Sequence, residues 1–519
     1  MSSAISVNLP PPPVQTVGFF ARRPPWLIAS AFAGLHPECM IRWEMATSAN
    51  RAFFPRLQAK FWLFRGHLEI KRKQYRDALR YFEKVIRANP DSAVAWAQAA
   101  FCLNHLQRID EAFLAFDRAI SIAPNFADAH AHTAQIHSKS AHNQEAYEAL
   151  HRAFRMKPKL KDSAYWSALL GSLCLRLNRW EEAHAAYASV TAAEPQNQEA
   201  WLGLGISLGR LERWQDALDV FRKIVQRNAR NDRAWHGIGW SAAVLGRESE
   251  ALNALERSIQ LAPQNAAALC ELADIHYKLG QFEQALGPIQ ESVRIRPTDP
   301  AAQHALAMIF CALEQFDRAV EPLSKALAIG PEFSEVYFEL AMVHCQLKEF
   351  EKAVQAFQHA IRLQPDCAEY YCRLGFAYLN LQKRTEASQA SREALRLNPE
   401  LPDAHMCLGC ALHEPGTFDQ ALAAYEKSLA LNPDQYEALA NLGDALYQLG
   451  RPVDAKNALL RAVAINQKDA NLRQLLGEVY SQLGLRSEAL AQYEILKQLD
   501  PALADSLAKT LENRPSISP

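Results

Sequence analysis

Prolines recur along this chain at a spacing of 34 residues, and this period constrains the fold more than any other feature. The series starts with Pro90, Pro124 and Pro158, and after a three-residue insertion at 161–163 it runs from Pro195 to Pro501, with Ala229 and Gln467 at the two places that lack proline. If each proline is placed at repeat position 32, thirteen consecutive repeats span residues 59–503. A period of this length is typical of solenoid proteins, in which each repeat packs mainly on its neighbours.

Other positions of the repeat are as regular as the proline. Position 20 is alanine in all thirteen repeats, position 8 is glycine or alanine, and position 24 is large and apolar except at Ser391. Each repeat also holds two runs of apolar residues at three- and four-residue spacing, which predicts two amphipathic helices. Small residues at positions 8 and 20 let the two helices approach closely, and glycines at position 15, such as Gly280, suit the turn between them.

This arrangement of small and large positions over 34 residues resembles the tetratricopeptide repeat family. The resemblance covers 445 of the 519 residues. It implies an all-α fold, a right-handed superhelical solenoid of tandem helix-turn-helix hairpins. It also implies protein binding, although this scaffold serves many unrelated partners.

The two ends of the chain do not follow the repeat. We expect residues 1–58 to be a proline-containing leader that is partly disordered. Residues 38–54 are a candidate capping helix within it. Leu503, Leu507 and Leu511 are spaced four apart, so residues 504–519 are predicted to form a C-terminal capping helix and tail.

Composition and motifs exclude several classes of protein. A net charge of −1 gives no reason to expect nucleic acid as the main partner, and no apolar run is long enough to span a membrane. Ten scattered cysteines favour a reducing compartment, and we expect a cytoplasmic location. The sequence contains no P-loop, no dinucleotide-binding glycine motif, no nucleophile elbow and no zinc-protease motif. We therefore expect no enzyme activity and no cofactor.

In the family that the chain resembles, positions 2, 5, 6, 9, 12 and 13 of the repeat face a concave groove that binds partner segments. Basic residues predominate there in repeats 1–6, and acidic residues predominate in repeats 7–13. The basic residues of repeats 1–6 are Lys60, Lys71, Lys139, Arg176, Arg210 and Arg233, against Asp128 and Glu199. The acidic residues of repeats 7–13 are Glu271, Asp274, Glu335, Glu339, Glu369, Asp403, Glu414, Glu437, Asp444 and Glu478, against Lys278 and Arg373.

This polarity predicts that the C-terminal half binds a basic or amine-rich segment, with the charges also setting its orientation. The alternative is that the acidic residues only solvate an unoccupied face. Two specialised forms of the family do not fit this chain. A carboxylate clamp needs lysines and asparagines that are missing here. An asparagine ladder needs asparagine at position 6 of every repeat, and only Asn441 meets this requirement.

The stretch HMCLGCALHEPG, residues 405–416, contains a candidate metal or redox site. The repeat register places Cys407, Cys410, His413 and Glu414 on the groove face, with Cys407, Cys410 and Glu414 in one line along a helix and Cys372 of the preceding repeat nearby. Thiolates from this group are candidate metal ligands, although structural zinc sites usually take their ligands from loops. Ordinary lining of the groove is the favoured interpretation.

The sequence therefore predicts a non-catalytic scaffold or adaptor that binds peptide or helical segments of other proteins and assembles a complex. The alternatives are a metal- or redox-responsive adaptor that uses the cysteines and, less favoured, an RNA-binding helical repeat protein. Self-association is compatible with both the leading prediction and the alternatives.

Overall fold

The computed structural model describes residues 55–512, and these residues form helices and turns without a β-strand. They fall into two compact units, one that ends at Arg247 and one that begins at Glu248. The leader up to residue 54, with its predicted capping helix at 38–54, lies outside the described residues. Within residues 55–512, every helix is too short or too polar to cross a bilayer.

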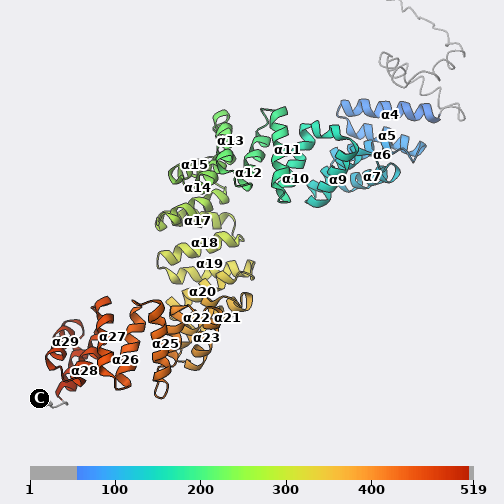
Figure 1. Cartoon of the computed structure of the whole chain (residues 1–519). Coiled ribbons are helices and arrows are strands. Elements are labelled where there is room, and N and C mark those ends of the chain that lie inside the picture. Colours follow the sequence, from blue (N-terminus) through green and yellow to red (C-terminus); the bar gives the residue numbers. More distant parts are fainter. Residues whose placement is uncertain (1–54, 513–519) are drawn as a thin grey trace, which may run out of the picture. The chain divides into compact units, whose positions relative to one another are not determined.

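The first unit contains eleven described α-helices and one 3₁₀-helix, which follow one another along the chain (Figure 1). Their bounds are α4 (Pro55–Lys71), α5 (Tyr75–Ala88), α6 (Ala93–His105), α7 (Ile109–Ile122), α8 (Ala127–Lys139), α9 (Asn143–Met156), η2 (Pro158–Asp162), α10 (Ala164–Arg176), α11 (Trp180–Ala193), α12 (Gln198–Arg210), α13 (Trp214–Arg227) and α14 (Asp232–Val244). The three-residue insertion at 161–163 coincides with η2 and the residue after it.

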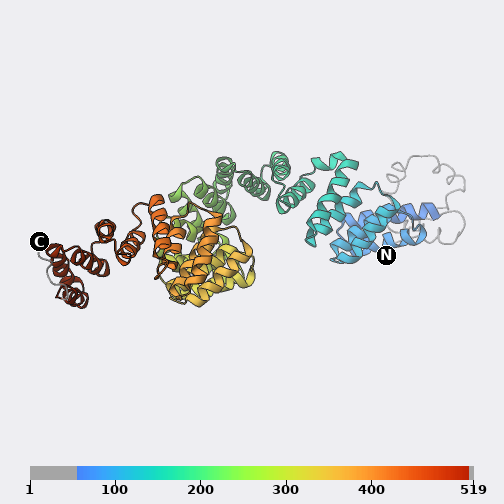
Figure 2. The same ribbon diagram turned by 60° about the horizontal axis from the view of Figure 1, so that its bottom comes forward.

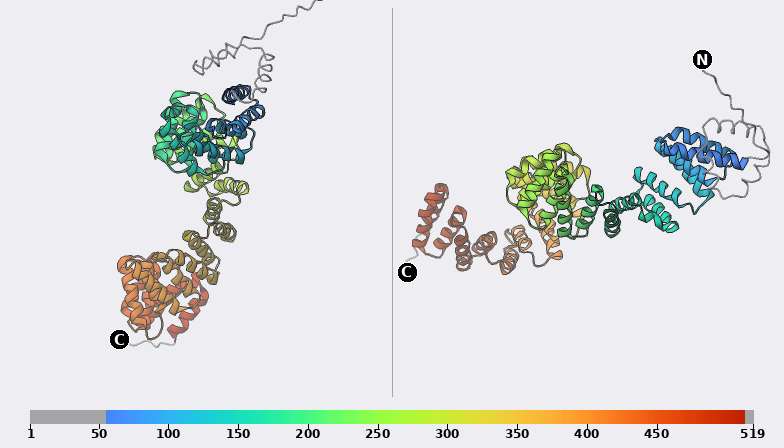
Figure 3. Two further views of the ribbon diagram at one scale, coloured as in Figure 1. Left: turned by 90° about the vertical axis from the view of Figure 1, so that its right-hand side faces the viewer. Right: turned by 90° about the horizontal axis from the view of Figure 1, so that it is seen from above.

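The second unit contains sixteen described α-helices and continues the same alternation (Figure 2; Figure 3). Their bounds are α15 (Glu248–Leu261), α16 (Ala266–Lys278), α17 (Phe282–Ile295), α18 (Pro300–Ala312), α19 (Phe316–Ile329), α20 (Ser334–Gln346), α21 (Phe350–Leu363), α22 (Ala368–Asn380), α23 (Arg384–Leu397), α24 (Pro402–Ala411), α25 (Phe418–Leu431), α26 (Tyr436–Gln448), α27 (Pro452–Ile465), α28 (Ala470–Gln482), α29 (Arg486–Leu499) and α30 (Pro501–Glu512).

Helices α4–α29 are alternately the first and second helices of thirteen repeats, so the predicted all-α array of hairpins is confirmed. The unit boundary falls inside repeat 6, between α14 and α15. Helix α4 begins at Pro55, four residues before the predicted start of the first repeat, and α30 packs on α28 and α29.

The small positions of the repeat hold each hairpin together. All thirteen alanines at position 20, from Ala78 to Ala489, are fully buried. At position 8, a Cβ atom added to Gly66 would lie 2.6 Å from the ring of Phe82, the position-24 residue of the same repeat. Since core Cβ atoms do not tolerate such distances, these glycines allow an aromatic ring to lie directly on the first helix.

The turn between the two helices has the same backbone conformation throughout. Position 15 has a positive φ in all thirteen repeats, from Lys73 at 60° to Gly484 at 74°. A left-handed residue after a helix caps its last carbonyl groups, which explains the glycines that the sequence places there. Eight repeats hold another residue type in this conformation, and the strain is tolerated because the hairpin contact fixes the turn.

A second recurring contact joins seven of the repeats to the one before. A polar side chain at position 4 donates a hydrogen bond to the carbonyl oxygen at position 32 of the preceding repeat. Examples are Trp96 to Pro90 at 2.8 Å and Arg473 to Gln467 at 2.7 Å. The outer side of the first helix is thus anchored to the preceding turn, while its other side is left to face the groove.

Candidate partner-binding surfaces

The groove positions of neighbouring repeats meet because successive first helices contact each other within each unit. In the first unit these contacts join α6, α8, α10, α12 and α14, and in the second they include α22, α24, α26 and α28. A side chain at a groove position can therefore bind a side chain one repeat away. The predicted groove residues divide into those that make such contacts and those that remain exposed.

Four carboxylates occupy position 2 in four successive repeats of the second unit, and we call them the carboxylate row. The row consists of Glu335 on α20, Glu369 on α22, Asp403 on α24 and Glu437 on α26. Each lies in the first turn of its helix, where the helix dipole stabilises a negative charge. Glu335, Glu369 and Glu437 are exposed, whereas Asp403 is half-buried.

Charge compensation along the row is incomplete. Arg373 reaches two members, since its guanidinium lies 3.7 Å from the carboxylate of Glu369 and 3.5 Å from that of Asp403. Gln435 also donates a hydrogen bond of 2.9 Å to Asp403. Glu335 and Glu437 have no ion-pair or hydrogen-bond partner within residues 55–512. The two ends of the row are therefore free to bind cations.

Glu339 differs from the carboxylate row because it is already paired. It accepts a hydrogen bond from His304, which crosses from α18 to α20. This hydrogen bond raises the pKa of His304 above its ordinary value, although burial acts in the opposite direction. Glu339 is thus largely a structural contact between repeats.

Other predicted acidic residues of the second unit also have partners. Asp274 pairs with Lys278 one turn along α16, at 2.6 Å, and Glu271 on the same helix is half-buried. Asp444 accepts a hydrogen bond of 3.0 Å from His413, which lowers the pKa of Asp444. The exposed pair of Asp274 and Lys278 contributes little stability, and both pairs remove free charge from the surface.

The predicted line of Cys407, Cys410 and Glu414 along one helix is wrong. Helix α24 ends at Ala411 and is three residues shorter than most first helices, which places His413 and Glu414 in the following turn. Pro415 explains the early end, because proline disfavours helical backbone at the residue before it and has no N–H to donate.

Cys407 and Cys372 are also not on the groove surface. Their exposed fractions are 0% and 1%. Cys410 is half-buried, and its sulfur accepts a hydrogen bond of 3.4 Å from Asn441. Cysteine is small and apolar enough to be buried wherever the packing leaves room. These thiols are packing residues, and Asn441 is held against one of them.

The burial of the thiols weakens the metal and redox hypothesis. It raises the pKa of Cys372 to about 12 and also raises the pKa of Cys407, whereas a metal ligand or nucleophile must be a thiolate. Across residues 55–512, no three histidine, cysteine or acidic side chains are arranged to hold a metal ion.

In the first unit, most of the predicted basic residues contact protein groups. Lys139 donates a hydrogen bond of 3.2 Å to Asn104 of the preceding repeat, and Arg233 pairs with Glu199 at 2.8 Å. Lys60 is exposed on α4. Only part of the predicted positive charge is therefore available to a partner.

The remaining basic residues of this set are Lys71, which is exposed in the last turn of α4, and Arg176 and Arg210. Arg176 donates weak hydrogen bonds of 3.4 Å to the carbonyl oxygen of Ser138 and to Asn143. Arg210 is exposed, and its guanidinium lies 5.7 Å from the ring centre of Trp180 and 5.3 Å from that of Trp240. Such cation–π contacts hold the arginine over a tryptophan surface.

A cluster of histidines and aromatic residues in repeats 1–4 was missed from the sequence. His105 stacks on Tyr75 at 4.3 Å and contacts Phe101, while His132 contacts Phe101 and Trp166. Burial lowers the pKa of both histidines, so their rings are mainly neutral at pH 7. Phe101, His105 and His132 occupy groove positions 9, 13 and 6, so a search for rings as well as charges would have found the cluster.

Comparison with protein families gives matches along most of the chain between residues 69 and 479. One model described as tetratricopeptide repeat matches residues 69–136 and 412–479, and a second model with this description matches residues 368–401. A model described as TPR repeat matches residues 341–382. The C-terminal domain of cilia and flagella-associated protein 70 matches residues 126–335. A search of curated proteins found no significant match.

Several solved structures are also similar. The APC/C hetero-tetramer Cut9-Hcn1 shares 16% identity over 90% of this chain and 98% of the other, with a TM-score of 0.43. MamA shares 22% identity over 33% of this chain and 92% of its own, with a TM-score of 0.32. A repeat protein from Parabacteroides merdae shares 18% identity over 48% of this chain and 100% of its own, with a TM-score of 0.41.

Proposed function

Because this chain is a tetratricopeptide repeat protein, we propose that it is a non-catalytic scaffold that binds segments of other proteins along its first helices. The second unit binds a basic or amine-rich segment on the carboxylate row. The first unit offers a separate surface of aromatic rings, histidines and exposed cations, so the scaffold can hold two unlike segments and assemble a complex.

The carboxylate row is the observation that carries this proposal. Helix dipoles favour an acidic residue in a first turn, but they give no reason for the same residue type at one position of four successive repeats. In the first unit no two successive repeats hold an acidic residue at this position, which is occupied by Lys60, Val94, Asp128, Tyr165, Glu199 and Arg233. A row that is exposed and only partly compensated attracts a cationic chain and sets its register.

The alternatives have less support. A metal- or redox-responsive adaptor needs accessible thiolates, whereas Cys372 and Cys407 are buried. An RNA-binding repeat protein needs a continuous basic surface, and the carboxylate row would repel phosphates. Nine cysteines of the described residues are free thiols, which supports a reducing compartment. A cytoplasmic location is therefore part of the proposal.

Affinity purification from the native source, followed by carbodiimide crosslinking, tests the proposal. Carbodiimide joins a carboxylate directly to an amine without a spacer, so only residues in contact react. We expect partner lysines joined to Glu335, Glu369 or Glu437. Crosslinks confined to carboxylates of the second helices, such as Glu351 or Glu386, would contradict the proposal. Imaging of the tagged protein separates a general cytoplasmic location from a ciliary one.

A further inference from the structure

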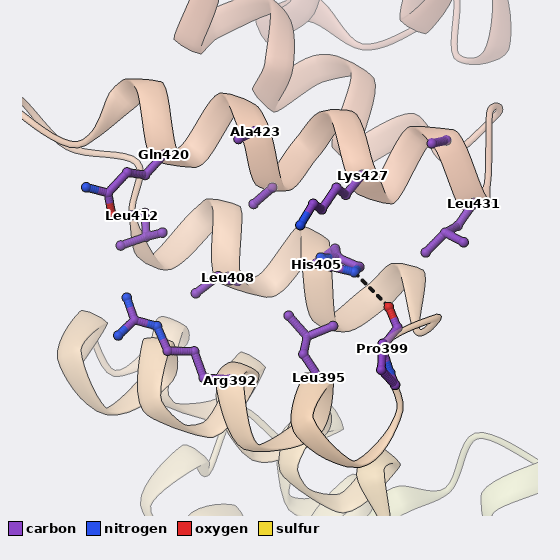
Figure 4. A pocket seen from close by; sticks show the side chains of 12 residues that line it. Arg392, Leu395, Pro399, His405, Leu408, Leu412, Gln420, Ala423, Lys427 and Leu431 are labelled. Carbon is purple, nitrogen blue, oxygen red and sulfur yellow. Dashed lines mark hydrogen bonds between the residues drawn. The ribbon is translucent and has the colours of Figure 1, made fainter.

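A second candidate surface lies on the outer side of repeats 10 and 11, between α23 and α25 and above α24 (Figure 4). The cleft has a volume of about 730 Å³. Leu395 and Leu408 form its apolar base, with Leu412 at one end and Leu431 at the other. Most of its lining is aliphatic, so it offers an apolar site to a side chain from outside.

This cleft is distinct from the groove. The cleft is lined by His405 and Leu408 of α24, at repeat positions 4 and 7, and by Leu412 directly after the helix, whereas the groove residues of α24 include Asp403 at position 2. These two sets lie on different sides of one helix. A ligand of the cleft would therefore leave the carboxylate row accessible.

The other repeats show what occupies the equivalent place. In repeat 1, the position-26 residue Lys84 lies 5.9 Å from the ring centre of Trp62 at position 4. In repeat 9, His359 at position 26 stacks on Tyr337 at position 4, at 5.0 Å. In these two repeats an aromatic ring at position 4 lies against a nitrogen-bearing side chain at position 26.

Repeat 11 has the cation without the large ring. Lys427 is at position 26, but position 4 is His405, whose Nε2 atom is hydrogen-bonded to the carbonyl oxygen of Pro399 at 2.9 Å (Figure 4). Within residues 55–512, Lys427 contacts no aromatic ring and has no ion-pair partner. The large ring that six repeats hold at position 4 is missing here, as it is in the remaining six repeats.

The charge around the cleft is of one sign. Arg392 on α23 and Lys427 on α25 are exposed on opposite walls, and the lining contains no carboxylate. Arg392 also lacks an ion-pair partner in the described part of the chain. An occupant with negative charge beside its apolar group would complement both cations.

We propose that this cleft binds a segment of a partner protein in which an aromatic side chain is flanked by carboxylates. The ring lies on Leu408 and Leu412 and against the Lys427 ammonium group, as the ring of Trp62 lies against Lys84 in repeat 1. Arg392 pairs with a flanking carboxylate, for which its planar guanidinium is well suited.

Binding of a fluorescein-labelled peptide to the full-length chain, followed by fluorescence anisotropy, tests this proposal. The probe carries one tryptophan between pairs of aspartates, and two comparison peptides replace the tryptophan by alanine or the aspartates by asparagine. We expect both comparison peptides to bind at least about tenfold more weakly, since the ring and the charges each contribute. Equal binding of all three peptides, or no binding of the probe, would overturn the proposal.

Two variants locate the binding site. His405→Trp supplies the ring that repeats 2, 5 and 6 hold at position 4, so it should fill the cleft while preserving the fold. Lys427→Glu reverses the charge at one wall. The matched controls are Gln303→Trp, at position 4 of repeat 8, and Lys223→Glu, at position 26 of repeat 5. We expect at least tenfold weaker binding for the first pair and unchanged binding for the controls.

Sedimentation of the chain without peptide gives an independent check. If the wild type dimerises and His405→Trp abolishes the dimer, a second copy occupies the cleft and the proposal is wrong. Wild-type affinity of both cleft variants would also overturn it. A basic peptide that binds the carboxylate row should be unaffected by His405→Trp, so failure here is distinguishable from failure of the proposed function.

Discussion

Cys407 of α24 fills the space beside Gly375 of α22: a Cβ atom on Gly375 would lie only 2.8 Å from its Sγ atom. In other repeats a large position-24 residue covers the position-8 glycine, as Phe82 covers Gly66. Repeat 10 has the small residue Ser391 at position 24. The side chain of Cys407, from the next repeat, fills the space that a larger residue would occupy. Cys407 is therefore part of the core between two repeats.

Replacing Cys407 by alanine should destabilise the second unit. Removal of a fully buried sulfur leaves a small cavity, so we expect a loss of about 1 kcal/mol. The midpoint of urea unfolding measures this change. Cys367→Ala is the control, because Cys367 is half-buried at the start of α22 and makes no capping hydrogen bond. An equal shift for both variants would contradict the packing role of Cys407.

Thiol labelling should follow burial. In the native protein, iodoacetamide should modify Cys367 well before Cys372 and Cys407, because burial raises the pKa of the latter two and shields them. Mass spectrometry of the digested protein gives the order. Early modification of Cys407 would mean that α22 and α24 separate readily and would revive the redox hypothesis.

The stability of the second unit should depend on pH through His304. The hydrogen bond with Glu339 raises the folded-state pKa of His304. The protonated ring therefore stabilises the fold. This contribution is complete below the unfolded-state value of about 6.5 and is lost as pH rises through the folded-state pKa. Urea midpoints at pH 5.5 and 8.5 should differ more for the wild type than for His304→Gln. An unchanged difference would exclude a stabilising role for the pair.

The tryptophan surface around Arg210 should be sensitive to its neighbouring glycine. A Cβ atom on Gly209 would lie 2.7 Å from the ring of Trp240. Gly209→Ala should therefore displace that ring, change tryptophan fluorescence and cost about 1–3 kcal/mol. Gly287→Ala is the control, since beyond its chain neighbours a Cβ there meets nothing within 4 Å, so tryptophan fluorescence should not change. Unchanged fluorescence of Gly209→Ala would contradict the close contact.

The hairpins were predictable from the sequence because the same contact is repeated in every unit. The pattern of small residues at positions 8 and 20 and a proline at position 32 fits one local arrangement, a pair of closely packed helices that ends at the proline. The charged residues at the groove positions can be read from the repeat register, but their pairing was not predictable. Partners such as His304 and Glu339 lie about one repeat apart and depend on how two hairpins stack.

The misplacement of Cys407 has a similar cause. The register treats every repeat as ideal, whereas repeat 11 loses the end of its first helix at Pro415 and repeat 10 lacks a large residue at Ser391. Both irregularities are visible in the sequence. Their joint effect, a cysteine drawn into the core, depends on contacts between the two repeats.

The carboxylate row is tested most directly by neutralising it in the full-length chain. The triple variant Glu335→Gln, Glu369→Gln and Glu437→Gln removes its exposed members, and a matched triple, Glu351→Gln, Glu386→Gln and Asp419→Asn, neutralises the first turns of α21, α23 and α25. Binding of a fluorescein-labelled lysine- and arginine-rich peptide is the measurement. The proposed function predicts about tenfold or greater loss of affinity for the row variant and little change for the matched triple. Equal affinity of the two variants would contradict it.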